Sequence, residues 1–129
     1  MFVTGGVTTA ATGGDFGTIA YDGVTGSRLW VRRYTGPGLY PDDAQSIALN
    51  AASTKVYVTG RAVPDPATGV VVTTFAYDAS TGSTLWSGFF RGISGYGRSI
   101  DLSPDGSRVF VGGWVTSDRT DYIALAYAA

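Results

Sequence analysis

The chain of 129 residues contains no cysteine, no histidine and no glutamate, and only one lysine. Without cysteine it has no disulfide framework and no cysteine-based zinc site. Without histidine or cysteine, a Ser–His or Cys–His nucleophile pair is excluded. We therefore lean towards a non-catalytic protein and leave an enzymatic role open.

Charge and hydrophobic patterning exclude further classes. Nine basic residues against ten aspartates give a formal net charge of −1, with no basic stripe. Binding to a nucleic-acid backbone is therefore not expected. No apolar run reaches the length of a membrane-spanning helix, so we also expect no membrane span. Nor does any window place apolar residues at helical spacing over three turns.

What the chain does contain is a repeat. Residues 20–30 read AYDGVTGSRLW, residues 76–86 read AYDASTGSTLW, and a third copy opens at Ala126-Tyr127. A second block, VYVTG at residues 56–60, returns as VFVGG at 109–113 and as MFVTG at 1–5. A period of about 50 residues with strand-like content indicates a propeller or a similar array.

Aligning the copies predicts an all-β chain, a β-propeller fragment of four-stranded antiparallel blades with about ten strands in total. Residues 1–35 form an incomplete blade of three strands, 43–91 a complete blade, and 96–129 another incomplete blade of three strands. The four strands of the complete blade are expected near residues 44–49, 55–60, 71–78 and 84–90. Met1 stands where the other copies have valine, so we hypothesise that the chain starts inside a strand of a longer repeat protein.

The residues at fixed positions in the first repeat carry a resemblance. They are Ala20, Asp22, Thr25, Gly26 and Trp30 in one copy, and Ala76, Asp78, Thr81, Gly82 and Trp86 in the other. This pattern resembles the tryptophan-docking blade repeat of quinoprotein dehydrogenases, which bind PQQ. The flanking blocks resemble bacterial propeller repeats of the SBBP and YVTN type. The resemblance implies that both tryptophans pack between neighbouring blades.

Each residue of the motif also has a direct physical role. The aspartate and threonine can accept backbone N–H groups across a turn, and the glycine can adopt a positive φ. We therefore interpret the ten motif residues as structural.

The favoured function is a binding or scaffold segment of a larger bacterial protein, which is expected to be secreted, periplasmic or on the cell surface. The alternatives are a piece of a quinoprotein-like oxidoreductase and a carbohydrate-binding surface propeller. No cofactor is predicted for this chain, and PQQ with calcium is expected only if the parent protein is a quinoprotein. The expected partners are the remaining blades and a protein or glycan ligand.

Variation between the copies predicts where a ligand would bind. Two types of turn repeat closely, whereas the loops at the other end of the strands differ between copies: residues 6–15, 61–70 and 114–120, and residues 35–43 and 91–97. Insertions in repeat proteins often map to the binding face. The candidate binding residues there are Tyr40, Asp42, Asp43, Arg61, Asp65, Tyr96, Arg98, Trp114 and Arg119.

Two of these features have alternative interpretations. Asp42 and Asp43 together can bind a hard cation or act in acid–base chemistry, and such a pair also commonly caps a turn in a solvated loop. Trp114 replaces Gly6 and Arg61 of the other copies. An exposed tryptophan there suits a sugar or protein ligand, whereas a buried one would fill a gap between blades.

Overall fold

The computed structural model describes residues 1–9, 13–37, 40–91 and 94–129, and within these ranges the chain forms strands and no helix. The prediction of an all-β chain with about ten strands is confirmed. In chain order the strands are β1 (Phe2–Val7), β2 (Asp15–Tyr21), β3 (Arg28–Tyr34), β4 (Asp43–Leu49), β5 (Lys55–Ala62), β6 (Val71–Asp78), β7 (Thr84–Phe90), β8 (Ser94–Leu102), β9 (Arg108–Thr116) and β10 (Thr120–Ala128).

Three short parts of the predicted variable loops, residues 10–12, 38–39 and 92–93, lie outside the described residues. In the part of the chain that is described, no helix is present that could span a membrane.

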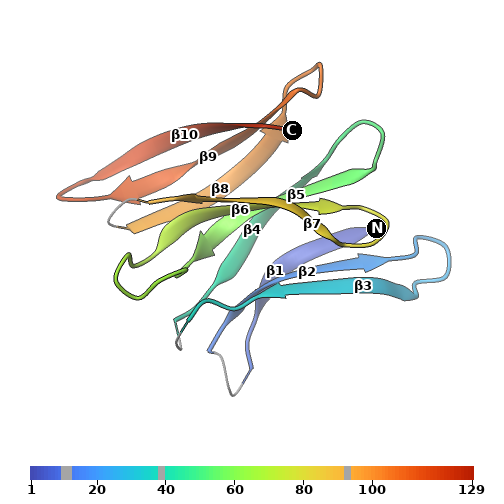
Figure 1. Cartoon of the computed structure of the whole chain (residues 1–129), viewed down its shortest axis with the longest axis horizontal. Helices are drawn as coiled ribbons and strands as arrows, with labels where there is room; N and C mark the ends of the chain where they lie inside the picture. Colours follow the sequence, from blue (N-terminus) through green and yellow to red (C-terminus); the bar gives the residue numbers. More distant parts are fainter. Residues whose placement is uncertain (10–12, 38–39, 92–93) are drawn as a thin grey trace.

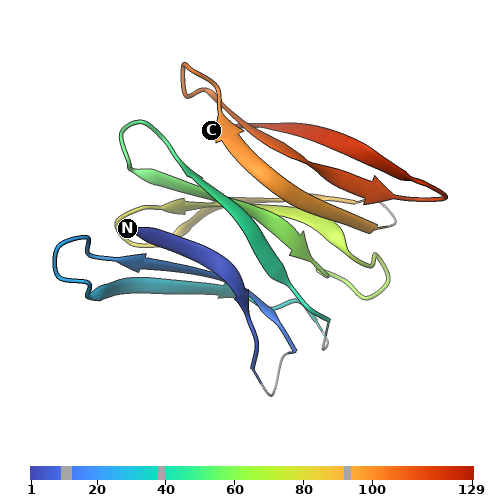
Figure 2. The ribbon, with the colours of Figure 1, turned by 180° about the vertical axis from the view of Figure 1, so that it is seen from behind.

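The strands form three antiparallel sheets: β1-β2-β3, β4-β5-β6-β7 and β8-β9-β10. The sheets lie one on another in chain order, with the four-stranded sheet in the middle (Figure 1). They do not close into a ring. Strand β4 contacts both β1 and β8. These three strands, each at the edge of its own sheet, lie on the near side in Figure 2, where β4 and β8 run in the same direction.

The middle sheet is buried on both faces. On one face Val58 and Phe75 pack against Phe16 of the first sheet. On the other, Tyr57 and Val72 lie in a second core that includes residues of the third sheet. Strand β6 is buried along almost its whole length, which explains its continuous apolar sequence: a strand covered on both faces has no solvated side to alternate with.

The same aromatic contact joins each pair of sheets. Between the first and second sheets, the Trp30 ring lies 5.7 Å from Phe2 and 6.2 Å from Tyr77. Between the second and third, the Trp86 ring lies 6.1 Å from Tyr57 and 5.3 Å from Tyr127. The three positions are equivalent in the repeat, so one sequence pattern builds both interfaces.

The turns that follow β2 and β6 share one hydrogen-bond pattern. Oδ1 of Asp22 accepts the backbone N–H groups of Val24 and Thr25, at 2.9 and 2.7 Å. Oδ1 of Asp78 accepts the equivalent groups of Ser80 and Thr81, at 3.0 and 2.8 Å. The glycine that follows in each turn has a φ near +70°. These contacts account for the strict Asp-x-x-Thr-Gly spacing.

Trp30 docks onto the second of these turns. Its indole Nε1 donates a 3.0 Å hydrogen bond to the carbonyl oxygen of Ala79. The adjacent Arg32 donates from Nε to the carbonyl oxygen of Gly82, at 2.6 Å, and from Nη2 to that of Thr81, at 3.1 Å. A Cβ on Gly82 would lie 2.7 Å from Trp30 Cδ2. Glycine is therefore required here both for its backbone angle and for the space that the indole occupies.

The two alanines of the motif complete the packing. Ala20 and Ala76 are buried and lie opposite Trp30 and Trp86 in the sheet register. In both copies the register shifts immediately after the alanine. Trp86 itself is half-buried, and no hydrogen bond from its indole is found within the described ranges.

Candidate functional site

Four of the candidate residues meet at one end of the second and third sheets, and we call Arg61, Tyr96, Arg98 and Trp114 the Tyr96 cluster. Arg61 lies near the end of β5, Tyr96 near the start of β8, Arg98 in the middle of β8, and Trp114 near the end of β9. These residues lie within strands, not in the loops where the sequence placed the variable segments. The ladders continue further than expected, since β8 begins at Ser94 and β9 reaches Thr116.

Tyr96 is the centre of the cluster. It lies opposite Trp114 in the register of β8 and β9, and the two rings stack with centroids 4.3 Å apart and planes 20° apart. The Arg61 guanidinium lies over the Tyr96 ring at 4.6 Å and donates a hydrogen bond from Nη1 to the tyrosine hydroxyl. The Arg98 guanidinium lies 6.0 Å from the same ring. Two cations and two aromatic rings are therefore gathered within one site.

Two equivalent β-bulges place the polar side chains at this site. The register shifts between Ala44 and Ser46 in one sheet, and between Gly97 and Ser99 in the next. The extra residues are Gln45 and Arg98, which occupy the same position in the repeat. Because a bulged residue leaves the regular alternation of the strand, bulges are a means of redirecting a side chain.

Glycines opposite the bulges make them possible. A Cβ on Gly60 would overlap the carbonyl oxygen of Asp43, and one on Gly113 would overlap that of Tyr96. Only glycine lets the bulged backbone approach the neighbouring strand so closely.

A chain of hydrogen bonds connects the two bulges. Nη1 of Arg98 donates to Oε1 of Gln45 at 3.2 Å, and Nε2 of Gln45 donates to Oδ2 of Asp43. The carboxylate of Asp43 is thereby held by an amide and lies against Gly6 of the first sheet. Gln45 was not among the residues selected from the sequence. Its alignment with Arg98 in the repeat is the signal that could have identified it.

Asp42 is turned inward and does not join the cluster. It is buried, and its Oδ2 accepts the backbone N–H of Gly36 at 2.5 Å while its Oδ1 accepts that of Val63 at 2.9 Å. Burial raises the pKa of this carboxyl group, and the two backbone hydrogen bonds lower it in part. Asp42 therefore ties the connection before β4 to the residue that follows β5, in a buried position and not in the solvated loop of the turn-capping interpretation.

The remaining candidates lie apart from the Tyr96 cluster. Tyr40 and Arg119 are exposed, and among the described residues no hydrogen bond or ring contact joins either side chain to the cluster. Asp65 caps its own turn by accepting the backbone N–H of Ala67 at 2.9 Å.

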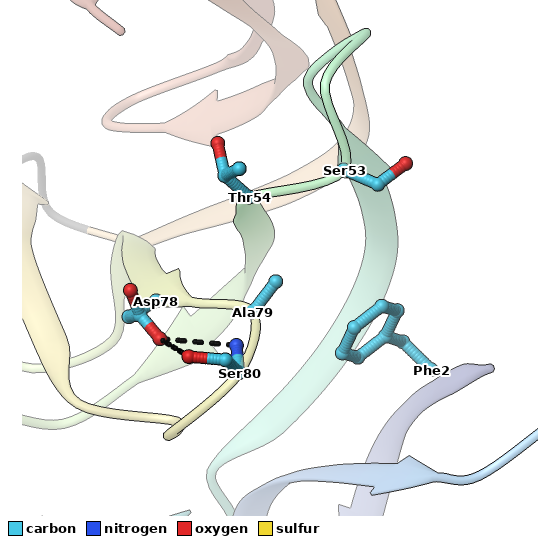
Figure 3. A pocket seen from close by; sticks show the side chains of 6 residues that line it. All are labelled: Phe2, Ser53, Thr54, Asp78, Ala79 and Ser80. Carbon is cyan, nitrogen blue, oxygen red and sulfur yellow. Dashed lines mark hydrogen bonds between the residues drawn. The ribbon is translucent and has the colours of Figure 1, made fainter.

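A hollow of about 240 Å³ lies beside the turn that follows β6. Figure 3 shows its lining residues, with Phe2 facing Ala79 and with the Asp78 carboxylate turned to Ser80. Hydrogen bonds from the Ser80 hydroxyl and from Thr81 lower the pKa of Asp78 to about 2. Since that carboxylate is committed to its own turn, we assign this hollow a structural origin.

No group of three acidic, histidine or cysteine side chains that could hold a metal occurs among the residues described. No protein-family model and no curated protein matches this chain. Function is therefore inferred from the packing of the sheets and from the Tyr96 cluster.

Proposed function

We propose that the three sheets are consecutive blades of a β-propeller, and that the chain is a section of a larger, non-catalytic binding or scaffold protein of the SBBP or YVTN type. The observation that carries this proposal is the exposure of equivalent residues. Val58 and Val111 are buried, each against the sheet before its own. Val3, the equivalent residue of the first sheet, is 47% exposed and lines a hollow of about 160 Å³.

On the faces that point towards the following sheet, burial likewise depends on whether a neighbouring sheet is present. Tyr57 is buried in the core shared with the following sheet, whereas its equivalent Phe110, in the last sheet, is 46% exposed. The first and last sheets thus present outward the apolar positions that are covered wherever a neighbouring sheet exists. Further blades of the same repeat, packed before the first sheet and after the last, would bury both.

The binding role is assigned to the end of the sheets that carries the Tyr96 cluster. The other end of the strands holds the repeated Asp-x-x-Thr-Gly turns, whose polar groups are consumed in holding the chain. At the cluster end the repeats differ, and side chains suited to recognition, arginine and tryptophan, stand half-buried or exposed.

Indole resonances test this role directly. The chain has three tryptophans, so a ¹H–¹⁵N NMR spectrum contains three indole N–H signals. In titrations with neutral saccharides, acidic saccharides and short peptides, at least one class of compound should shift the signal of Trp114, with those of Trp30 and Trp86 as internal controls. If no compound moves the Trp114 signal, or if the shifts gather at the Asp-x-x-Thr-Gly turns, the binding face is wrongly assigned.

A carbohydrate ligand is the second candidate, favoured by the stacked pair of Trp114 and Tyr96. Aromatic faces beside hydrogen-bonding groups suit the apolar face and hydroxyls of a sugar ring. Trp114→Ala should then abolish saccharide binding without unfolding the chain. The matched control is Phe110→Ala, which removes an exposed aromatic ring from the other end of the same strand. Binding that survives in Trp114→Ala rules this candidate out.

A further inference from the structure

We propose that Arg61 and Arg98 bind an oxyanion, a carboxylate or phosphate group carried by the ligand, beside the stacked rings of Tyr96 and Trp114. This inference rests on the proposed binding role, because it names the chemical class of ligand for the same face.

The first support is positive charge without an ion-pair partner. Both guanidinium groups lie within 6.0 Å of the Tyr96 ring centre, so two like charges lie near one ring. Neither forms an ion pair with a carboxylate among the described residues. The nearby Asp43 is bonded to the Gln45 amide, and Asp42 is directed to backbone N–H groups. A bound oxyanion would offset the positive charge that the two arginines bring to this ring.

The second support is an unsatisfied donor. Nε of Arg61 is buried and has no hydrogen-bond partner, and Nη1 is directed to the Tyr96 hydroxyl. A buried donor on a charged group without an acceptor is costly and rare in folded proteins. Among the described residues, the only oxygen bonded to this guanidinium is the neutral Tyr96 hydroxyl, and the planar fork of an arginine matches a carboxylate or phosphate group.

The third support is positioning. Arg98 stands on a bulge that Gly113 makes possible, and its guanidinium is oriented by the 3.2 Å hydrogen bond to Gln45. Gln45 stands on the equivalent bulge of the second sheet, so the repeat itself brings these two side chains together across the sheets. The arrangement places an oriented cation on the surface near the Tyr96 ring, and Trp114, stacked on that ring, is available to meet the apolar part of a ligand.

The test compares ligands that differ only in charge. We would titrate the whole chain with glucuronate, glucose and inorganic phosphate at constant ionic strength, following the Trp114 indole and the arginine Nε–H signals. The account predicts saturable binding of glucuronate, of phosphate or of both, and no comparable binding of glucose. Binding of glucuronate alone identifies a carboxylate ligand, and binding of phosphate alone identifies a phosphate ligand.

Charge-matched variants give the control. Arg61→Gln and Arg98→Gln should each weaken oxyanion binding by about tenfold, the effect of losing one charge-assisted hydrogen bond. Arg119→Gln removes the same charge from an exposed residue outside the cluster and should bind as the unaltered chain does. Amide spectra establish that each variant is folded.

Three results would overturn the inference. The first is no saturable oxyanion binding, and the second is equal weakening in Arg98→Gln and Arg119→Gln, which means unspecific attraction. The third is equal binding of glucose and glucuronate, which refutes recognition of the charge while leaving the binding face in place.

Discussion

Gly82 offers a direct test of how the sheets dock, because Gly26 is a matched control. The two glycines occupy the same position in equivalent turns, with φ values of +70° and +72°. Substitution by alanine therefore imposes the same backbone cost at both sites, roughly 1–2 kcal/mol. The surroundings differ: a Cβ on Gly26 would meet nothing within 4 Å, whereas one on Gly82 would lie 2.7 Å from Trp30 Cδ2 and 2.9 Å from Cε3.

The Trp30 ring has little freedom to move away. It is buried and held by the hydrogen bond from its Nε1 to the Ala79 carbonyl. Overpacking a site of this kind costs typically about 1–3 kcal/mol. Gly82→Ala should therefore destabilise the chain by roughly 2–5 kcal/mol, against roughly 1–2 kcal/mol for Gly26→Ala.

The assay is urea unfolding followed by far-ultraviolet circular dichroism. In a Trp30→Leu background the ring that creates the overlap is gone, so the difference between the two alanine variants should shrink, which completes a double-mutant cycle. A difference between Gly82→Ala and Gly26→Ala smaller than about 0.5 kcal/mol, the usual error of additivity, would refute the docking of Trp30 on this turn.

Three further predictions concern stability. Tyr57→Phe removes a buried hydroxyl that has no hydrogen-bond partner, at a position where both other copies carry phenylalanine. The substitution should stabilise the chain by about 1–3 kcal/mol in the same urea assay. A loss of stability would mean that the Tyr57 hydroxyl does form a hydrogen bond in the folded chain. Ser53 has a φ of +55°, and the equivalent residue is Gly106, with a φ of +70°. Ser53→Gly should therefore raise the free energy of unfolding by about 1 kcal/mol and Gly106→Ala should lower it by a similar amount, and effects of the same sign would contradict the backbone assignment. Hydrogen bonds lower the folded-state pKa of Asp78 from 3.8 to about 2, so the stability they confer is present above pH 4 and lost as the pH falls from about 4 to 2. Asp78→Asn should therefore flatten the plot of melting temperature against pH between about pH 4 and 2. An unchanged slope in this range would show that the turn does not stabilise the Asp78 carboxylate.

Much of the fold could be predicted because each strand carries its own local signals. The continuous apolar sequence of β6 is typical of a strand covered on both faces, and the Asp-x-x-Thr-Gly turns mark where strands end. Repetition reinforced both signals, since a single alignment located strands in all three sheets.

The arrangement of the binding face was less accessible. Its key event is a register shift of one residue at Gln45 and at Arg98, and a bulge leaves few traces in a single sequence. The glycines opposite, Gly60 and Gly113, are compatible with many other roles. The sequence therefore placed Arg61, Tyr96, Arg98 and Trp114 on one variable face, but did not predict their assembly around one ring.

Burial separated candidates that looked alike in the sequence. Asp42 and Asp43 are adjacent in the sequence. Asp42 is buried and accepts backbone N–H groups from two loops, whereas Asp43 accepts a hydrogen bond from Gln45. Such a division depends on contacts between residues distant in the chain, such as Asp42 with Val63, which neither composition nor spacing encodes.

The central claim is that successive sheets pack through the docked tryptophan, and hydrogen exchange of the three indole N–H groups tests it most directly. The account predicts that the Trp30 proton, buried and bonded to Ala79, exchanges most slowly and shows nuclear Overhauser contacts to residues 79–82. Trp114, at the half-exposed binding face, should exchange much faster. Exchange of the Trp30 proton as fast as that of Trp114, with no contact to residues 79–82, would contradict it.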